Sequence, residues 1–370
     1  MRPGETLGVL GGGQLGRMLA LEARRMGFRT IALDPTPDGP AGQFCDELVV
    51  GNFADVDAAI RLAERCSVVT LETEHIALPV LRAVEAIRPL YPSADILGTI
   101  QDRLSQRQFL DRIGVPHTRY ADTPDASALS AALDELGRPA ILKTRREGYD
   151  GKGQVAIRDE RSFEAARALL AKQPCLLEAF VPFDKEISCV AARSADGSFA
   201  AYPIAENIHR NHILHATIAP ARIRSETARR AEEVTRAIAE GLGLVGLLAV
   251  EFFVLPDGTL LVNEIAPRTH NSGHFTLGAC ATSQFEQQAR CVMGLPLGDT
   301  TLFTPAVMVN LLGDLWLGRS PRWDLLLGLP NARLHLYGKA EAKAGRKMGH
   351  LLVLGADVDA ALRLADEIVA

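Results

Sequence analysis

Two glutamates on either side of a tight turn have the spacing that most strongly suggests chemistry. Glu251 and Glu264 lie in an apolar segment, Leu247 to Ile265, which the turn signal Pro256-Asp257-Gly258-Thr259 interrupts. A β-hairpin centred on this turn places the two carboxylates opposite each other, with Cβ atoms about 5 Å apart. Like charges there repel unless a cation lies between them, so the pair predicts a Mg²⁺ site that holds ATP phosphates. Two solvated acids on an exposed face, or a shifted register, are the alternatives.

A glycine-rich loop is the second chemical feature. Its residues are Gly148, Tyr149, Asp150, Gly151, Lys152, Gly153 and Gln154. Three glycines in six residues can turn backbone N–H groups toward phosphates, and a hairpin tip of this kind can close as a lid. Lys143 lies in the strand before the loop, where its ammonium could reach an α-phosphate. The alternative is a solvent-exposed hairpin with a snorkelling lysine.

Polar groups gather after the hairpin and near the C-terminus. Arg268, His270, Asn271, Ser272 and His274 form a stretch too polar for a core, which predicts a substrate wall. Tyr337-Gly338-Lys339 and Gly345 to His350 place cations beside glycines, a local anion site in an acidic chain. A solvated charged turn is the alternative for this second group. His209, His212 and His215 lack accompanying thiolates or carboxylates, so we expect nucleotide contact by one histidine rather than a transition-metal site.

The first hundred residues must position part of this chemistry. An apolar run, Thr6–Leu10, precedes Gly11 to Gly16 and a helical pattern over 14–26, and a second strand ends at Asp34. This order is typical of a doubly wound domain. The glycines and Asp34 alone predict dinucleotide binding, and a tight turn required only for packing is the alternative. Glu74 follows the strand predicted at 68–71, where a carboxylate accepts from ribose hydroxyls.

The middle of the chain predicts an α+β unit joined to this α/β one. Helices are expected at 101–112, 127–136 and 226–240, and strands at 140–145, 154–158, 175–180, 186–192 and 198–203. The tail predicts strands at 335–337 and 351–354 and a helix at 357–369.

Composition excludes several classes. The 370 residues hold 40 Lys and Arg against 45 Asp and Glu, a net charge of −5 that favours neither nucleic acid nor a membrane surface as a partner. No apolar run approaches the roughly 20 residues of a membrane span, and no secretory signal is evident. The six cysteines show no C-x-x-C pair and read as small buried side chains. We therefore expect a cytoplasmic protein.

The assembled motifs resemble the ATP-grasp enzymes and, within them, the N5-carboxyaminoimidazole ribonucleotide synthetases of purine biosynthesis. The resemblance spans nearly the whole chain. It rests on Gly11 to Met18, Gln101-Asp102-Arg103, Lys143 to Arg146, Gly148 to Gln154, Asn263 to Arg268, His270 to His274, Tyr337 to Lys339 and Gly345 to His350. It departs at Thr269 and Ala344, where relatives often have Pro, and neither change removes a reactive group.

The resemblance implies an ATP-grasp fold with a Rossmann-like domain at 1–103, a lid subdomain at 104–182, a catalytic subdomain at 183–310 and a C-terminal domain at 311–370. It implies that ATP and bicarbonate give carboxyphosphate, whose carboxyl group passes to the exocyclic amine of 5-aminoimidazole ribonucleotide. The small-molecule partners would be these three substrates. The cofactor would be Mg²⁺, with two ions bound. The protein would form a homodimer.

The resemblance also implies roles for single residues. Glu251 and Glu264 match the metal ligands, and Asp150, Arg268, His270 and Lys339 match the reacting centre. The residues matching ATP contacts are Arg103, Lys143, the loop 148–154, Glu178, Ala179, Phe180, Val181, Glu186, His209, Asn263 and Glu264. Those matching the aminoimidazole substrate's site are Gln14, Leu15, Glu74, Asn271, Ser272, Lys339, Arg346 and Lys347.

Three other functions compete with this one. A formate-dependent glycinamide ribonucleotide transformylase is also an ATP-grasp ligase with a similar glycine turn and basic tail. A nicotinamide-dependent dehydrogenase explains Asp34 and the first glycine turn but gives the glutamate pair no role. A nucleotide-binding regulator without turnover would keep Lys143 and the lid and tolerate loss of the metal acids.

Overall fold

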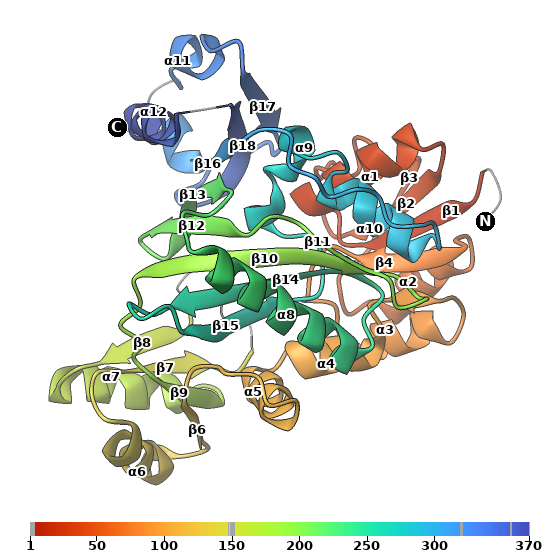
Figure 1. Ribbon diagram of the computed structural model, residues 1–370. Helices are drawn as coiled ribbons and strands as arrows, with labels where there is room; N and C mark the ends of the chain where they lie inside the picture. The colour runs from red at the N-terminus through yellow and green to blue at the C-terminus, as the bar shows by residue number, and fades with distance from the viewer. Residues whose placement is uncertain (1–3, 147, 149–151, 319–320, 356, 370) are drawn as a thin grey trace.

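The computed structural model describes residues 4–146, 148, 152–318, 321–355 and 357–369, which build three β-sheets (Figure 1). The N-terminal sheet is parallel, in the order β3-β2-β1-β4-β5. Its strands are β1 (Thr6–Leu10), β2 (Arg29–Asp34), β3 (Glu47–Val50), β4 (Val68–Leu71) and β5 (Leu90–Tyr91). Its helices are α1 (Gln14–Arg25), α2 (Val56–Ala63), α3 (Leu78–Glu85) and α4 (Ala94–Ile100). The doubly wound prediction is confirmed, and β1 and β4 are apolar and buried as a covered parallel sheet requires.

The central sheet has nine strands in the order β15-β14-β10-β12-β13-β16-β18-β17, with β11 paired to β10, and its pairings are antiparallel. Its strands are β10 (Lys185–Arg193), β11 (Phe199–Ala201), β12 (Ala205–Arg210), β13 (Ile213–Ala219), β14 (Gly246–Val254), β15 (Leu260–Ala266), β16 (Ala306–Leu312), β17 (Ala332–Leu336) and β18 (Lys347–Leu354). The helix α8 (Ser225–Leu242) packs on β10 and β14, where it buries Ile238 and Val234 (Figure 1).

A separate four-stranded sheet, in the order β6-β9-β7-β8, lies at the lower edge of Figure 1. Its strands are β6 (Tyr120–Thr123), β7 (Ala140–Thr144), β8 (Gln154–Ile157) and β9 (Cys175–Ala179). The helices α6 (Ala126–Leu136) and α7 (Glu160–Leu170) give it a core of its own, and α5 (Arg103–Arg112) leads into it. This unit has a core of its own, and we call its four strands the lid sheet, after the lid subdomain predicted at 104–182.

Six helices remain within the ranges given above, of which only α10 and α12 are longer than five residues. They are the 3₁₀ helices η1 (Asn271–Gly273) and η2 (Gly313–Trp316), and the α-helices α9 (Thr276–Ala279), α10 (Gln284–Val292), α11 (Trp323–Leu327) and α12 (Val358–Val369). Contacts between α10 and α1 join the central unit to the N-terminal one, as Figure 1 shows.

The hairpin β14–β15 contains the decisive irregularity. Val254 pairs with Leu260 and Phe252 with Val262, but a bulge at Asn263 follows, after which Glu251 pairs with Glu264. The predicted opposition of the two glutamates is confirmed. The predicted register is wrong on the turn side of the bulge, because the strands there are offset by one residue and Asn263 is the extra residue that restores the pairing.

The start of α5 also differs from the prediction. The helix begins at Arg103 rather than Gln101, because Asp102 is extended and its Oδ1 accepts from the N–H groups of Leu104 and Ser105. Arg145 donates to both carboxylate oxygens of this same Asp102, at 3.0 and 2.8 Å. One carboxylate therefore caps α5 and anchors the end of β7.

The cysteines and the helix lengths bear on the class of protein. All six cysteines are free, and five of them are buried, which confirms their prediction as small apolar side chains. In the described part of the chain, no helix combines the length and the apolar character that crossing a bilayer demands.

Candidate active site

The paired glutamates lie in an environment that a cation would relieve. The Glu251 side chain is only 15% exposed, and Glu264 opposes it across the hairpin. Burial, and then the charge of Glu264, raise the pKa of Glu251 to about 7. Carboxylate oxygens are the ligands that Mg²⁺ prefers, so the donor set fits the ion. No group of three or more His, Cys, Asp or Glu among the described residues is arranged to hold a metal, so phosphate oxygens would complete the coordination.

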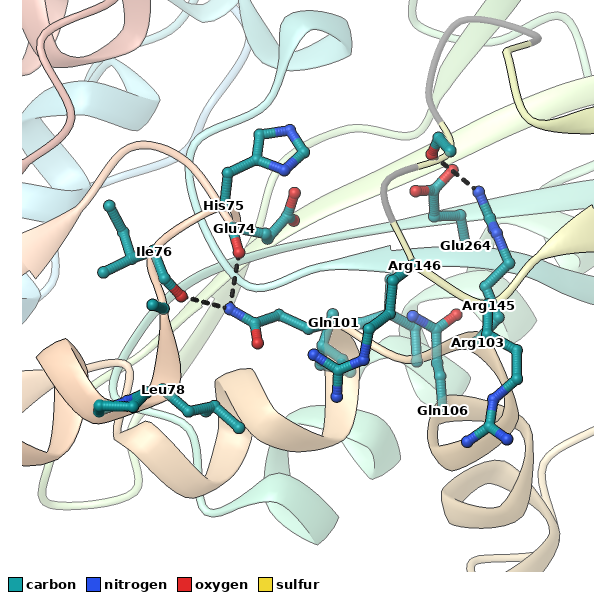
Figure 2. Close-up of a pocket in the computed structure, with 15 residues that line it drawn as sticks. Glu74, His75, Ile76, Leu78, Gln101, Arg103, Gln106, Arg145, Arg146 and Glu264 are labelled. Carbon is teal, nitrogen blue, oxygen red and sulfur yellow. Dashed lines mark hydrogen bonds between the residues drawn. The ribbon is translucent and has the colours of Figure 1, made fainter. Parts of the chain in front are cut away.

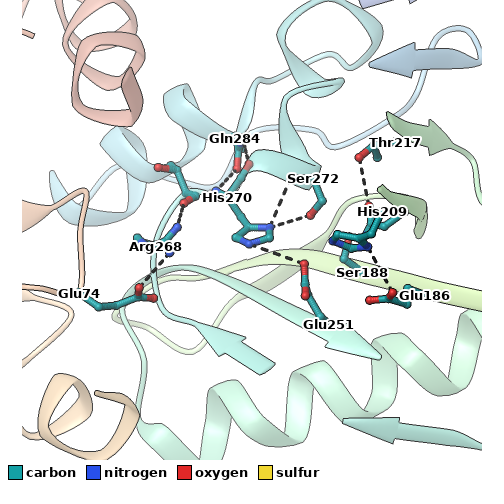
Figure 3. A network of polar contacts seen from close by, with 12 residues as sticks. Glu74, Glu186, Ser188, His209, Thr217, Glu251, Arg268, His270, Ser272 and Gln284 are labelled. Carbon is teal, nitrogen blue, oxygen red and sulfur yellow. Dashed lines mark hydrogen bonds and ion pairs between the residues drawn. The ribbon is translucent and has the colours of Figure 1, made fainter. Parts of the chain in front are cut away.

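A polar network surrounds Glu251 (Figure 3). His270 Nε2 lies 3.8 Å from its Oε1, and His270 Nδ1 lies 2.8 Å from the Ser272 hydroxyl. Gln284 on α10 holds the His270 backbone with two hydrogen bonds, at 2.9 and 2.7 Å. Burial, and then the charge of Arg268, lower the pKa of His270 well below its usual value, so the ring is neutral at pH 7. Ser272 is fully buried, so its hydroxyl orients the His270 ring.

Arg268 joins the central unit to the N-terminal domain. Its Nη2 lies 2.9 Å from Oε2 of Glu74, which follows β4, and Figure 3 shows this pair beside His270. Arg268 Nε and both polar side-chain atoms of Asn271 are buried without a hydrogen-bond partner in the described structure. Buried polar atoms left unpaired are costly, so these groups are ready to bind a polar ligand.

A cavity of about 480 Å³ brings distant parts of the chain together (Figure 2). Glu74 lines it from the N-terminal domain, Arg103 and Gly148 from the lid side, and Glu264 from the hairpin. Gln101 closes one wall by donating to the backbone oxygens of Glu74 and Ile76, both at 2.7 Å. At least one residue from each of the predicted ATP, metal and substrate sets therefore lines this cavity, whereas Glu251, Lys143, His270 and Lys339 lie outside its lining.

Lys143 is engaged within the protein. Its Nζ lies 2.6 Å from Glu178 Oε2, and Glu178 is 2% exposed. Burial would raise the pKa of Glu178, but the charges of Arg107 and Lys143 outweigh it and hold the pKa far below its usual range. For Lys143, burial dominates and lowers the pKa. The ammonium that was predicted to reach an α-phosphate is thus paired with Glu178, the first residue of the predicted adenine hinge.

The glycine loop is described at its two ends. Arg103 Nη2 donates to the Gly148 oxygen at 3.1 Å, and Thr144 N donates to the Gly153 oxygen at 2.8 Å. Gly153 has φ of 71°, and a Cβ there would lie 2.6 Å from the Thr144 hydroxyl, so this position requires glycine. Lys152 and Gln154 complete the described part. The predicted residues Tyr149, Asp150 and Gly151 lie outside the described residues.

The C-terminal cations lie near β18. Lys339 Nζ donates to the Lys347 oxygen at 2.7 Å, and Arg346 Nη1 to the Glu341 oxygen at 2.8 Å. Burial, and then the charge of Arg346, lower the pKa of Lys339 to about 8. The charge of Glu72 opposes this shift of the Lys339 pKa.

The N-terminal glycine turn is filled by the protein's own acids. Glu72 accepts from Gly13 N and Gly16 N, both at 3.1 Å, and Asp34 accepts from Gly12 N at 2.7 Å. A Cβ at Gly13 would lie 2.8 Å from a Glu72 oxygen, so the glycine admits this carboxylate. The geometry favours the alternative of a packing turn over dinucleotide binding, because both Asp34 oxygens accept from the local backbone. This geometry removes the argument for a dehydrogenase. Gln14 and Leu15 begin α1 at this turn, and their contact with substrate stays a prediction.

The predicted ATP contacts lie on or after β9 of the four-stranded sheet and on β10 and β12 of the central sheet. His209 Nδ1 lies 3.3 Å from Glu186 Oε1, and Figure 3 shows this pair on the same side as Glu251. Ala179 ends β9, and Val181 follows with Phe180, whose side chain is 45% exposed. An exposed phenylalanine at the hinge between two sheets is available to an aromatic base.

Comparisons with known proteins agree with this geometry. The ribonucleotide synthetase preATP-grasp domain family matches residues 4–101, and the ATP-grasp domain family matches residues 108–285. The phosphoribosylaminoimidazole carboxylase C-terminal domain family matches residues 306–364. A Bacillus subtilis N5-carboxyaminoimidazole ribonucleotide synthase is 43% identical over 94% of this chain and 91% of its own. The Brucella melitensis enzyme of that name is 44% identical over 95% and 96%. The chain belongs to the N5-carboxyaminoimidazole ribonucleotide synthase family.

Solved structures of this synthase family are similar throughout. The Staphylococcus aureus synthetase complexed with ADP matches with a TM-score of 0.93 and 35% identity, over 100% of this chain and 98% of that one. The Aspergillus clavatus synthase in complex with ADP and 5-aminoimidazole ribonucleotide matches with a TM-score of 0.91 and 31% identity, over the full length of both. The chain is therefore an ATP-grasp ligase of purine biosynthesis that uses ATP, and the ATP-grasp fold prediction is confirmed.

Several residues of this synthase site were not assigned from sequence. Arg145 and Arg146 line the cavity, Gln284 holds His270, and Glu72 fills the glycine turn. Arg145 and Arg146 are adjacent cations directly after β7, and this pattern could have indicated that they line an anion-binding site. The other two act through backbone contacts made across the fold, which no local pattern in the sequence indicates.

Proposed function

We propose that this protein catalyses the reaction for which its family is named. ATP activates bicarbonate as carboxyphosphate, and the carboxyl group passes to the exocyclic amine of 5-aminoimidazole ribonucleotide, with release of ADP and phosphate. One observation carries the proposal. A single cavity joins Glu74, Arg103, Gly148 and Glu264, which come from the substrate, ATP and metal parts of the sequence pattern.

The residues around ATP supply positive charge and a loop that closes over the phosphates. Arg103, Lys143 and the loop 148–154 bind the phosphates, and residues 178–181 with Glu186, His209 and Asn263 bind the nucleoside. Glu251 and Glu264 would hold Mg²⁺, which supplies charge neutralisation at the transferred phosphoryl group when bound. Phosphoryl transfer asks the protein mainly for positioning and charge neutralisation, and these residues provide both.

The residues around the second substrate orient that substrate and exclude water from it. Glu74, Asn271, Arg346 and Lys347 bind 5-aminoimidazole ribonucleotide with the backbone of Gln14 and Leu15, and Ser272 orients His270. Arg268 and Lys339 stabilise the developing carboxylate. His270 is neutral and can move a proton at Nε2, and Asp150 orients the substrate amine. Carboxyphosphate reacts with water, so closure of the predicted glycine lid, residues 148–154, over the cavity protects it.

Phosphate release from ATP tests the proposal. We expect release to require both bicarbonate and 5-aminoimidazole ribonucleotide. Release supported by formate with glycinamide ribonucleotide would instead assign the transformylase activity. ATP binding without release under any condition would assign a regulator without turnover.

We also propose a cytoplasmic homodimer with two Mg²⁺ ions in each active site. The six free cysteines support a reducing compartment. The dimer and the metal count rest on the family resemblance. Sedimentation equilibrium gives the mass of the assembly, and Mg²⁺ titration of the ATP-bound protein gives the number of ions.

A further inference from the structure

Arg107 is a buried cation without a role in the proposed reaction. It lies on α5 and is 1% exposed, the largest fully buried side chain among the described residues. A guanidinium taken out of water is tolerated only when its donors are satisfied. Its partners therefore show what it holds in place.

The partners of Arg107 belong to two different sheets. Its Nε and Nη2 donate to Glu178 Oε1 on β9, at 2.9 and 2.6 Å. Its Nη2 also donates to the Asn263 oxygen on β15 at 2.7 Å, and its Nη1 to the Val262 oxygen at 3.3 Å. One planar group thus spans the lid sheet and the hairpin of the central sheet.

The hairpin partner is the bulge itself. Asn263 is the extra residue on β15, so its backbone leaves the regular ladder between Phe252–Val262 and Glu251–Glu264. Arg107 binds the carbonyl of this residue, directly before Glu264. The contact fixes the local conformation that sets Glu264 opposite Glu251.

Glu178, the partner of Arg107 in the lid sheet, also binds Lys143. Glu178 offers one oxygen to Arg107 and the other to Lys143 Nζ at 2.6 Å. A continuous chain of contacts therefore runs from the backbone before Glu264, through Arg107 and Glu178, to Lys143.

We propose that Arg107 is a positioning residue that sets the nucleotide-binding face of the lid sheet at a defined distance from the metal-binding hairpin. It does this by holding Glu178 and the Asn263 carbonyl in one hydrogen-bonded fork. The inference rests on the proposed ATP and metal roles of Lys143, Glu178 and Glu264. It adds that a buried residue to which no substrate contact is assigned controls how Mg²⁺-ATP fits between the lid sheet and the hairpin.

Replacement by lysine separates geometry from charge. Arg107→Lys keeps the positive charge, but an ammonium cannot reproduce the planar fork that reaches a carboxylate and two carbonyls together. We expect Mg²⁺-ATP affinity to fall about tenfold by calorimetry, because the lid and hairpin faces lose their fixed spacing. The Mg²⁺ concentration for half-maximal phosphate release should rise, while the KM for 5-aminoimidazole ribonucleotide changes less than about twofold.

A matched control lies on the same helix. Arg112 ends α5 and is exposed, so Arg112→Lys should leave nucleotide affinity and Mg²⁺ dependence as in the wild type. Unchanged nucleotide affinity and Mg²⁺ dependence in a folded Arg107→Lys protein would overturn the proposal. Equal losses for both substrates, matched by a large fall in thermal midpoint, would also overturn it, because they would indicate general loosening.

A second experiment does not depend on the stability of one variant. Glu178→Gln and Arg107→Lys should have non-additive effects on nucleotide affinity, since both interrupt the same chain of contacts. Additive effects would contradict the coupling. Binding is measured without turnover, so failure of the wild type to use 5-aminoimidazole ribonucleotide would refute the reaction and leave the test of Arg107 intact.

Discussion

Glu264 is the exposed member of the carboxylate pair, so its charge serves binding more than folding. We expect Glu264→Gln to lower kcat at least about 100-fold, because a charged metal ligand is lost at the phosphoryl-transfer site. The free energy of unfolding should stay within about 0.5 kcal/mol of the wild type, as for most surface changes. Phosphate release and urea unfolding measure the two quantities.

The control for this prediction is Glu232→Gln, an equally conservative change on the exposed face of α8. It should alter neither quantity. Wild-type turnover by Glu264→Gln would contradict the metal role.

Lys339 is expected to give the reaction an alkaline limit. Burial lowers the pKa of this ammonium to about 8, so its positive charge is lost as pH rises through that value. If the charge stabilises the carboxylate, kcat/KM falls above about pH 8, whereas Lys339→Arg stays charged and lacks that decline. Rate profiles from about pH 6.5 to 9.5 check this, and Lys343→Arg, at an exposed lysine, should keep the wild-type profile. An unchanged alkaline limb in Lys339→Arg would assign the titration elsewhere.

At the scale of elements, Asp102 connects helix α5 to strand β7. Burial would raise its pKa, but hydrogen bonds from Arg145 and that residue's charge outweigh it, so the pKa is lowered and the carboxylate stays ionised. Asp102→Ala removes the helix cap and leaves Arg145 unpaired. We expect a loss of about 2 kcal/mol in the free energy of unfolding, from about 1 kcal/mol for the cap and the remainder for the broken pair.

The comparison for this element is Asp125→Ala. Asp125 caps α6 by accepting from Ala128 N at 2.8 Å, at an exposed position. It has the cap role alone, so urea unfolding should show about 1 kcal/mol of loss. Equal losses in the two variants would show that the Arg145 contact adds no stability.

At the scale of the whole molecule, three histidines join the substrate loop to the C-terminal strands. His350 on β18 stacks on His335 of β17, with ring centroids 4.5 Å apart, and lies 4.7 Å from the His274 ring. Tyr337 OH lies 2.9 Å from His350 Nδ1. Burial lowers the pKa of His274 to about 3 and that of His350 well below its usual value, so both rings fold neutral.

This stack predicts loss of stability in acid. Below about pH 6.5 these histidines bind protons in the unfolded chain but stay neutral in the folded chain. The free energy of unfolding therefore decreases as pH falls from neutral. Each histidine contributes about 1.4 kcal/mol per pH unit. Urea unfolding between about pH 7 and pH 5 should show this slope, and His350→Gln should reduce it by one histidine. His212→Asn, at an exposed turn, should leave it unchanged. An unaltered slope in His350→Gln would place the acid-sensitive groups elsewhere.

Local patterns in the sequence determined much of this protein. Alternation and turn residues were enough to predict β1, α1 and the hairpin, because each depends on neighbours within a few residues. The glutamate pair followed from the hairpin. The spacing of the glycines predicted a phosphate-binding loop, and that role stays a prediction. The bulge at Asn263 was not predictable, because Arg107 stabilises it from 156 residues away.

The tertiary structure alone decided which charges are free and which are already paired. The sequence pattern treated Asp34 as a ligand-binding group, yet the folded chain uses it to hold a glycine turn. The proposed phosphate contact Lys143 is paired with Glu178, a partner that the sequence pattern did not indicate. Burial also made His270 neutral and raised the pKa of Glu251. Composition and spacing show which ionisable groups a chain carries. Desolvation and long-range partners set the pKa values of those groups, and both arise only once the sheets have packed.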